Sequence, residues 1–380
     1  MDRVSSLLER ARAATSLDDF GDESFREGLE ILVACADTQA GLHEQGRAAF
    51  DHQVVDLLSR RLEVEHWYRM HPEIDEQEIV APLIGLGLPR TGSTALYCLL
   101  AEDPAVRCIR TWESQAPCPP PETATQHTDP RIAEAAQRQA FQDQMLPRLR
   151  AMLPLSPTAP MECQNFMGYD FKSMVFGAMA KLPDYSEWLN YKADLVPTYR
   201  YVKRVLKLLQ WRCPPRRWRL KNPNHTLYIT ALDKVFPDAR YWMTHRDVAD
   251  VIPSVTELYC SLAAGLTDQV DIPYTAEFCQ AWTELGMRRL IAFRDAGRDS
   301  RFFDIYFAPF QRDPFPDLEN LYRFIGEPFT DEARRRMQAW RDNSPREKLE
   351  YDPAAFGIDL GRVRDRFRFY SDRFHLADHA

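Results

Sequence analysis

The chain has 380 residues, of which 45% are hydrophobic and 27% are charged, and its formal net charge is -8. A chain of this length and composition can bury a substantial core, as one large globular domain or two closely associated ones. The negative net charge gives no general electrostatic reason to bind nucleic acid, so we expect no nucleic-acid partner.

The eight cysteines are scattered, and no Cys-x-x-Cys pair or zinc-ligand spacing occurs among them. We therefore expect reduced thiols and no metal site. No apolar run approaches the roughly eighteen residues that a membrane span needs. These features predict a cytoplasmic protein without a membrane span.

Helical periodicity occupies residues 2–14, 24–39 and 43–70. We expect these helices to form an N-terminal cap over residues 1–78, ahead of a main domain over 79–375. The cap could cover the mouth of a substrate site, hold the partner of a homodimer, or simply complete the core.

The stretch 81–99 is the most informative part of the sequence, because it predicts a strand, a loop and a helix in succession. Residues 81–86 are short and apolar enough for a buried parallel strand, and leucines at helical spacing follow from residue 95. Glycines in the loop between allow close backbone approach, and the amides at the start of the helix can point at an anion. The expected anion-binding residues are Arg90, Thr91, Gly92, Ser93 and Thr94.

The spacing from Gly87 to Gly92 fits a Walker A loop, but Ser93 and Thr94 follow where that loop requires Lys and then Ser or Thr. The missing lysine argues against a site for a metal-bound triphosphate. Arg90 can supply the cation instead. The plain alternative is a glycine-containing turn that only joins a strand to a helix.

Residues 106–111 predict a second strand, which leads into Glu113 and then a proline-rich extended loop. This placement puts Glu113 at the carboxyl end of a parallel strand, where α/β enzymes bind their ligands. A lone glutamate at such a position is usually just solvated.

A long helical insertion over 130–212 is rich in methionine and aromatic residues. Part of it should be core, and part could form an apolar wall that selects an acceptor. Glu162, Asn165 and Asp170 are polar residues there that could orient an acceptor hydroxyl.

Further strands are expected over 218–221, 240–245 and 301–307, with helices over 274–298, 315–326 and 330–342. Strands that alternate with helices predict an α/β fold, a three-layer sandwich with a central parallel sheet of the P-loop kind. Lys221 and Arg246 then follow neighbouring strand ends, and Ser254 lies about two turns into the next helix.

Several of these motifs together resemble sulfotransferases that use PAPS (3′-phosphoadenosine 5′-phosphosulfate). They are the Pro-Arg-Thr-Gly-Ser-Thr loop of residues 89–94, Lys221-Asn-Pro, the Phe236-Pro-Asp-Ala-Arg240 lead-in, and Arg246 followed by Ser254. The resemblance covers roughly residues 80–375. It is strongest to the bacterial branch, which is also similar to tyrosylprotein sulfotransferases.

The resemblance implies PAPS as co-substrate, a small-molecule acceptor and no metal. The loop from Arg90 fits the 5′ side of PAPS, and Arg246 with Ser254 fits its 3′-phosphate. In the family's arrangement Glu113 is the general base, and Lys221 with Arg90 stabilises the bridging oxygen. The apolar insertion favours a hydrophobic or phenolic acceptor.

Alternatives stay open at this stage. His225, four residues after Lys221, is a rival base. A metal-dependent small-molecule kinase, or a nucleotide-binding protein without activity, could use the same scaffold. The arginine-rich tail over 361–370 lacks the Arg-Lys-Gly form of the family's phosphate-clamping loop, so a solvated amphipathic helix is the preferred interpretation of it.

Overall fold

A computed structural model describes residues 2–145, 147–152, 156–213, 216–344 and 351–379. The chain forms two compact units, each described here by itself. The helical unit comprises Met1–Ile79, Ile109–Pro215 and Tyr259–Asp271. The sheet unit comprises Val80–Cys108, Arg216–Leu258 and Ile272–Ala380.

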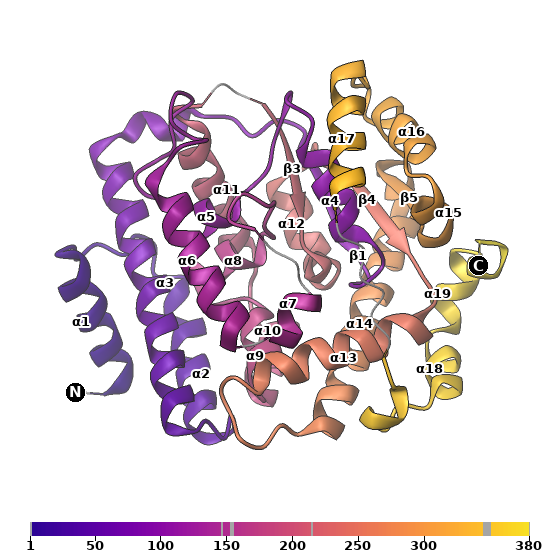
Figure 1. Cartoon of the computed structure of the whole chain (residues 1–380). Coiled ribbons are helices and arrows are strands. Elements are labelled where there is room, and N and C mark those ends of the chain that lie inside the picture. The colour runs from indigo at the N-terminus through magenta and orange to yellow at the C-terminus, as the bar shows by residue number, and fades with distance from the viewer. Residues whose placement is uncertain (1, 146, 153–155, 214–215, 345–350, 380) are drawn as a thin grey trace. The chain divides into compact units, whose positions relative to one another are not determined.

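The sheet unit is built on five strands: β1 (Leu83–Gly87), β2 (Val106–Arg107), β3 (Arg217–Lys221), β4 (Arg240–His245) and β5 (Phe302–Tyr306). Their order across the sheet is β2-β3-β1-β4-β5, and every neighbouring pair is parallel. Figure 1 shows β1 and β4 among the helices of this unit. The predicted α/β class with a central parallel sheet is confirmed.

The helices that accompany these strands are α4 (Ser93–Ala101), η3 (Pro223–Tyr228), α12 (Ile229–Val235), α13 (Val248–Ala263), α14 (Ile272–Phe293), η4 (Arg294–Arg298), η5 (Asp299–Arg301), α15 (Phe307–Arg312), α16 (Phe315–Ile325), α17 (Asp331–Asn343), η6 (Pro353–Phe356), α18 (Leu360–Arg366), α19 (Arg368–Arg373) and η7 (Leu376–His379). The helix α13 continues into the helical unit at its carboxyl end. The helices predicted over 274–298, 315–326 and 330–342 are present, within a few residues at each end.

The side chains of a strand alternate between the two faces of the sheet, so both faces carry apolar side chains. Helices cover both faces. On one face Leu83 and Trp242 belong to a buried cluster with residues of α4, α15, α16 and α17. On the other face Tyr241 stacks on Phe302, with ring centroids 4.7 Å apart, and Phe302 contacts Phe293 of α14. The sheet unit is therefore the predicted three-layer sandwich.

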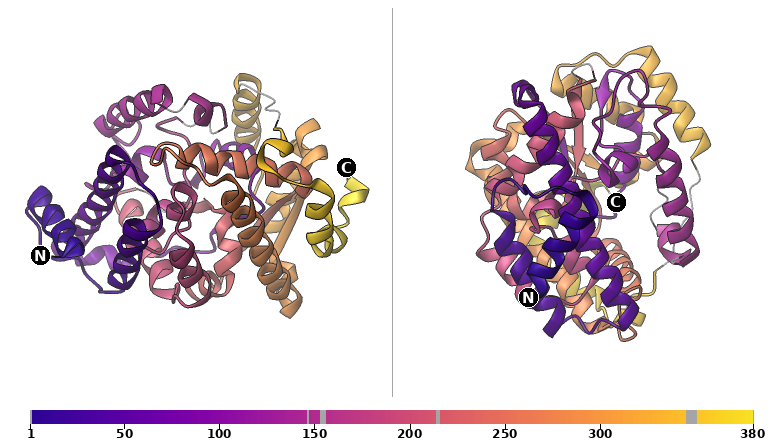
Figure 2. Two further views of the ribbon diagram at one scale, coloured as in Figure 1. Left: turned by 90° about the horizontal axis from the view of Figure 1, so that it is seen from below. Right: turned by 90° about the vertical axis from the view of Figure 1, so that its left-hand side faces the viewer.

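The helical unit contains α1 (Arg3–Thr15), α2 (Phe25–Thr38), α3 (Glu44–Met70), η1 (Pro72–Glu76), α5 (Thr111–Gln115), α6 (Pro130–Met145), α7 (Pro147–Met152), α8 (Gln164–Met167), η2 (Gly168–Asp170), α9 (Val175–Met179), α10 (Pro183–Tyr191) and α11 (Val196–Gln210). The three N-terminal helices match their predicted ranges closely. Figures 1 and 2 show the indigo helix α1 beside α3, against which it packs.

A buried arginine on α3 organises the core of the helical unit. The Arg61 side chain is fully buried and donates hydrogen bonds to the carbonyls of Phe20, Asp22 and Tyr169. It also pairs with the equally buried Asp170, at 3.4 Å. Since a buried charge needs a partner, Asp170 neutralises Arg61, and its predicted use in orienting an acceptor is not supported.

Most of the apolar residues singled out in the insertion belong to this core. Those at most 7% exposed are Phe166, Met167, Tyr169, Phe171, Met174, Phe176, Tyr185 and Trp188. Aromatic residues at helical spacing do not reveal which helix face is covered, so the predicted apolar wall is in large part packed interior. Among the described residues, no helix is both long and apolar enough to cross a membrane.

Candidate functional site

Three neighbouring strand ends assemble the candidate site of the sheet unit. The central strand β1 lies between β3 and β4, and Gly87 at its end is level with Thr244 of β4. On the other side Gly85 is level with Lys221, the last residue of β3. The loop after β1, Lys221 and the residue after His245 therefore meet at one edge of the sheet, as the sequence predicted.

The loop after β1 has an unusual backbone. Gly87 and Gly92 have φ values of 120° and 84°, and Arg90 has a φ of 62°. Positive φ is uncommon for a residue with a side chain, and such strain is often found at functional sites. Gly92 caps the start of α4, so the amides of the first helical turn point out of the helix toward this loop. This backbone can bind an anion.

Two threonines of the loop have different surroundings. Thr91 is fully buried and donates from its hydroxyl to the carbonyl of Leu88 at 2.9 Å, while it also bonds to the hydroxyl of Thr244. Its side chain therefore fixes the loop to β4, which leaves its backbone amide as the group that could meet an anion. Thr94 is exposed, and its hydroxyl accepts a hydrogen bond from Lys221 Nζ at 3.1 Å.

The lysine at the end of β3 is 3% exposed, although its side chain carries a charge. A buried ammonium group requires polar partners or a bound anion. Its contact with Thr94 places this cation at the first turn of α4. Ser93, the first residue of that helix, is 6% exposed.

Arg90, Ser254 and Arg246 form one connected cluster. Arg90 donates from Nε to the hydroxyl of Ser254 at 2.9 Å, and Arg246 donates from Nη1 to the carbonyl of Arg90 at 3.2 Å. The Arg246 guanidinium also bonds to Asp250 and lies 4.3 Å from the ring centroid of Phe307. The structure thus brings together two arginines that the sequence assigned to opposite ends of PAPS.

A tyrosine that sequence analysis missed completes this cluster. Arg90 donates from Nη2 to the hydroxyl of Tyr351 at 3.1 Å. Tyr351 is 261 positions away in the sequence and lies in no motif. Only the folded chain could reveal this contact.

The rival base His225 lies on η3, just beyond Lys221. It is 1% exposed, and burial lowers its pKa to about 3. The ring is therefore neutral at neutral pH. The predicted helix start is found here as a 3-10 turn, which the side chain of Asn222 caps by accepting from the Asn224 amide at 3.1 Å.

Glu113 belongs to the helical unit, and its local structure differs from the prediction. The strand expected over 106–111 ends at Arg107, and Glu113 lies on the short helix α5. Its Oε2 accepts a hydrogen bond from the backbone amide of Arg110 at 2.9 Å, as in a capping box. This capping begins a helix at Thr111, the last residue of the range predicted as a strand. The side chain is 1% exposed.

Several hydrogen bonds fix α5 within the helical unit. The amides of Thr111 and Trp112 donate to carbonyls of the segment 157–159, each at 3.0 Å. Asn165 donates to the hydroxyl of Ser114 at 3.2 Å, and Tyr169 donates to its carbonyl at 3.1 Å. Ser114, the neighbour of Glu113, is thus held by both Asn165 and Tyr169.

The arginine-rich tail forms two short helices, α18 and α19, and not the single helix that the sequence predicts. Arg364 pairs with Asp247 at 2.9 Å, and Arg366 pairs with Glu277 at 2.9 Å and Glu284 at 2.6 Å. These arginines therefore pair with carboxylates of the sheet unit. Among the described residues, no group of three or more His, Cys, Asp or Glu side chains could hold a metal ion.

Comparisons with known proteins agree with this architecture. A family model described as "Sulfotransferase family" matches residues 82–331. The chain is similar to the crystal structure of sulfotransferase STF9 from Mycobacterium avium, with 30% identity, a TM-score of 0.91, and 97% of this chain and 96% of that chain covered. It is also similar to sulfotransferase STF1 from Mycobacterium tuberculosis H37Rv, with 27% identity, a TM-score of 0.83, and 96% and 98% covered.

A shorter match exists to the omega-hydroxy-beta-dihydromenaquinone-9 sulfotransferase Stf3 of Mycobacterium bovis and Mycobacterium tuberculosis. It has 27% identity over 157 residues and covers 38% of this chain. The matched stretch spans 38% of the length of these curated relatives.

Proposed function

The chain belongs to the sulfotransferase family, and we propose that it transfers the sulfuryl group from PAPS to a hydroxyl of a small hydrophobic or phenolic acceptor. The observation that carries the proposal is the cluster of Arg90, Lys221 and Arg246 at the carboxyl edge of the sheet. Three cations around a strand–loop–helix anion site suit a ligand with more than one anionic group.

The donor carries a 5′-phosphosulfate and a 3′-phosphate, so it needs two anion sites. The residues Arg90, Thr91, Gly92, Ser93 and Thr94 are proposed to bind the 5′ side through amides, hydroxyls and one guanidinium. Arg246 and Ser254 are proposed to bind the 3′-phosphate. A charged hydrogen bond of this kind contributes on the order of 1.5 to 3 kcal/mol.

In the proposed reaction, the acceptor oxygen attacks sulfur in line with the bond to the 5′-phosphate. Glu113 removes the acceptor proton as general base. The bond between sulfur and the bridging oxygen breaks, and Lys221 with Arg90 stabilises the charge that develops on that oxygen. The products are a sulfate ester and adenosine 3′,5′-bisphosphate. The chemistry of these steps requires no metal ion.

His225 is the less suitable base. A general base works best when its pKa is near the operating pH, whereas burial lowers the pKa of His225 to about 3. A ring that binds a proton so weakly gives little driving force for proton removal. The kinase alternative also loses support, because the chain belongs to a sulfotransferase family and lacks the Walker lysine.

The acceptor is proposed by chemical class. The similar Stf3 proteins are named for a hydroxylated dihydromenaquinone, which is a hydrophobic alcohol. The same class suits an acceptor contact near Met161 and Asn165, which are partly exposed in the helical unit. A homodimer, a cytoplasmic location and an N-terminal cap over 1–78 stay predictions.

Incubation with PAPS labelled with ³⁵S tests the proposal. The panel contains phenols, long-chain alcohols, sugars and a tyrosine peptide, and a parallel series uses ATP labelled in its γ-phosphate with magnesium. We expect label transfer from PAPS to a phenol or long-chain alcohol, without added metal. Transfer only from ATP would refute the proposed activity, and transfer only to sugars would refute the acceptor class.

A further inference from the structure

The C-terminal segment Tyr351–Phe374 contacts the candidate donor site at more than one point. At its beginning, the Tyr351 hydroxyl accepts a hydrogen bond from Arg90 Nη2 at 3.1 Å. Arg90 Nε meanwhile donates to Ser254 at 2.9 Å. Two hydroxyls on different elements therefore set the direction of one guanidinium, and Tyr351 supplies one of them.

Near the end of the segment, Tyr370 on α19 is fully buried and contacts His245, the last residue of β4. Its hydroxyl is 3.0 Å from Nδ1 of His245, the residue that directly precedes Arg246. On its other side His245 bonds through Nε2 to the carboxylate of Asp304 at 2.8 Å. Because a carboxylate only accepts, Nε2 carries a proton, and in the neutral ring Nδ1 accepts from Tyr370.

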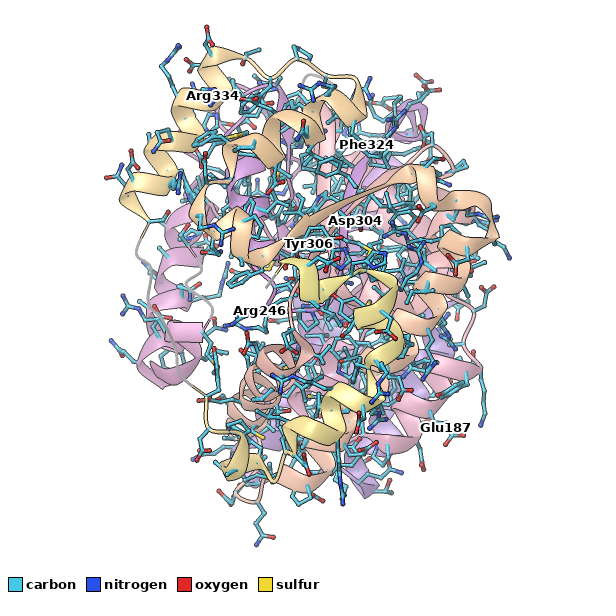
Figure 3. All side chains as sticks on the ribbon, turned by 90° about the vertical axis from the view of Figure 1, so that its right-hand side faces the viewer. Glu187, Arg246, Asp304, Tyr306, Phe324 and Arg334 are labelled. Atoms are coloured by element: carbon cyan, nitrogen blue, oxygen red, sulfur yellow. The ribbon has the colours of Figure 1, made fainter. Side chains whose placement is uncertain are left out.

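In this arrangement the Tyr370 hydroxyl donates to the ring of His245. The imidazole is held further by Phe374, whose ring centroid is 4.3 Å away, and Asp304 receives two hydrogen bonds from Arg294 at 2.8 and 2.7 Å. Figure 3 shows Asp304, Tyr306 and Arg246 beside the yellow C-terminal ribbon. A buried network therefore holds His245, and through the chain it positions the next residue, Arg246.

The arginines of the tail contribute less to this anchoring. Arg364 pairs with Asp247 at 2.9 Å, but the two side chains are 57% and 45% exposed. Ion pairs as exposed as this one add little to stability. The hydroxyls of Tyr351 and Tyr370 are the better candidates for an effect on the site.

We propose that the segment Tyr351–Phe374 is a positioning element of the donor site, in which Tyr351 orients Arg90 directly and Tyr370 orients Arg246 through the neighbouring His245. Both tyrosines are positioning residues, since each acts through an arginine. The inference rests on the proposed function, which assigns Arg90 to the 5′ side of the donor and Arg246 to its 3′-phosphate. It extends that function by giving the C-terminal tail a role without any arginine of the tail touching phosphate.

Adenosine 5′-phosphate and adenosine 3′-phosphate separate the effect of Tyr351 on Arg90 from the effect of Tyr370 on Arg246. Calorimetry measures the affinity of adenosine 5′-phosphate and adenosine 3′-phosphate for the full chain and for Tyr351→Phe, Tyr370→Phe and Tyr306→Phe. The third variant is the matched control, because the Tyr306 hydroxyl bonds to the carbonyl of Phe374 at 3.1 Å and so also attaches the tail. Each substitution removes one hydroxyl and keeps the ring.

We expect Tyr351→Phe to weaken adenosine 5′-phosphate by about 3- to 10-fold and to affect adenosine 3′-phosphate less. Tyr370→Phe should show the reverse, and Tyr306→Phe should change neither. A general loosening of the tail cannot produce this crossed pattern. Equal losses for both ligands in all three variants, or unchanged affinities in both test variants, would overturn the inference.

A variant that fails to fold and a failure of the proposed function can each be told apart from a failure of the positioning role. If Tyr370→Phe fails to fold, judged by its thermal transition, Tyr351→Phe still decides, because that side chain is only partly buried. Its unchanged affinity for adenosine 5′-phosphate would overturn the inference. If the unmodified chain does not bind adenosine 3′,5′-bisphosphate, the proposed function fails, whereas normal binding with no crossed pattern refutes only the positioning role.

Discussion

Arg90 Nε donates a hydrogen bond to the hydroxyl of Ser254 at 2.9 Å, and this bond joins the loop after β1 to the helix after β4. The two residues were assigned to opposite ends of the donor. Their contact means that the proposed 5′ and 3′ anion sites share a wall, which Arg246 completes through the carbonyl of Arg90. For a substitution at either anion site, the affinities of a 5′-phosphate ligand and of a 3′-phosphate ligand should therefore both be measured.

The Arg246→Ala variant tests the proposed 3′-phosphate site. We expect it to weaken adenosine 3′,5′-bisphosphate by about 10- to 100-fold, the loss of one charged hydrogen bond, and to leave adenosine 5′-phosphate nearly unchanged. Arg240→Ala is the matched control, because this exposed arginine lies at the opposite end of the same strand. Equal weakening of both nucleotides by Arg246→Ala, measured by calorimetry, would place Arg246 outside the 3′ site.

The Glu113→Gln variant tests the general base. Glutamine keeps the size of the side chain and can still accept the Arg110 amide, but it cannot take up the acceptor proton. Turnover should fall about 10²- to 10⁴-fold with little change in donor affinity. A phenol with a low pKa should partly restore turnover, since it needs less help to lose its proton.

His225→Asn is the comparison for this prediction, and it should have the milder effect on turnover. If Glu113→Gln keeps nearly full turnover while His225→Asn abolishes it, the role taken from the family resemblance is wrong and His225 is the base. Initial rates at saturating PAPS decide between the two results.

The Lys221→Met variant tests charge stabilisation in the transition state. Methionine fills a similar volume but cannot donate to Thr94 or to the bridging oxygen. We expect turnover to fall by about 10²- to 10³-fold, as for other lost transition-state donors. Lys234→Met, at an exposed position of α12, should keep normal turnover. A Lys221→Met enzyme that changes only the KM for PAPS would assign this lysine to ground-state binding.

The pH dependence of stability tests the burial of His225. Its pKa is about 3 in the folded chain and 6.5 in the unfolded chain, so below pH 6.5 only the unfolded chain gains this proton. The free energy of unfolding should fall as pH drops from 6.5 toward 3, at up to about 1.4 kcal/mol per pH unit from this group. Above pH 6.5 the group adds no pH dependence.

Urea unfolding at a series of pH values measures this slope. His225→Asn should flatten it between pH 6.5 and the onset of acid unfolding, whatever its effect on stability at pH 7. His52→Asn, at an exposed position, is the control for the substitution itself. An unchanged slope in His225→Asn would mean that the ring accepts a proton in the folded chain.

The sequence predicted the parts of the fold that depend on local pattern. The strand–loop–helix at Arg90 and the strand ends at Lys221 and Arg246 were placed correctly, because apolar runs and helical periodicity extend only over neighbouring residues. Parallel pairing then brought the three strand ends together. The missing Walker lysine is itself a local feature, so the sequence alone favours a sulfotransferase over a kinase.

The errors arose where a distant or single contact decides the structure. The strand expected over 106–111 is present only at Val106–Arg107, and the helix α5 begins at Thr111, where the Glu113 carboxylate caps the Arg110 amide. Asp170 was offered as an acceptor contact, but it pairs with Arg61, 109 positions away. The contact of Tyr351 with Arg90 has no signal in the sequence at all.

A calorimetric titration of the unmodified chain tests whether the site binds a nucleotide with both a 5′- and a 3′-phosphate. Adenosine 3′,5′-bisphosphate, adenosine 5′-phosphate and ATP with magnesium are titrated separately into the full chain. Two anion sites at one sheet edge, without a Walker lysine, predict that the bisphosphate binds at least about ten times more tightly than either of the others, with or without magnesium. Tighter binding of ATP with magnesium than of the bisphosphate would refute the proposed PAPS site.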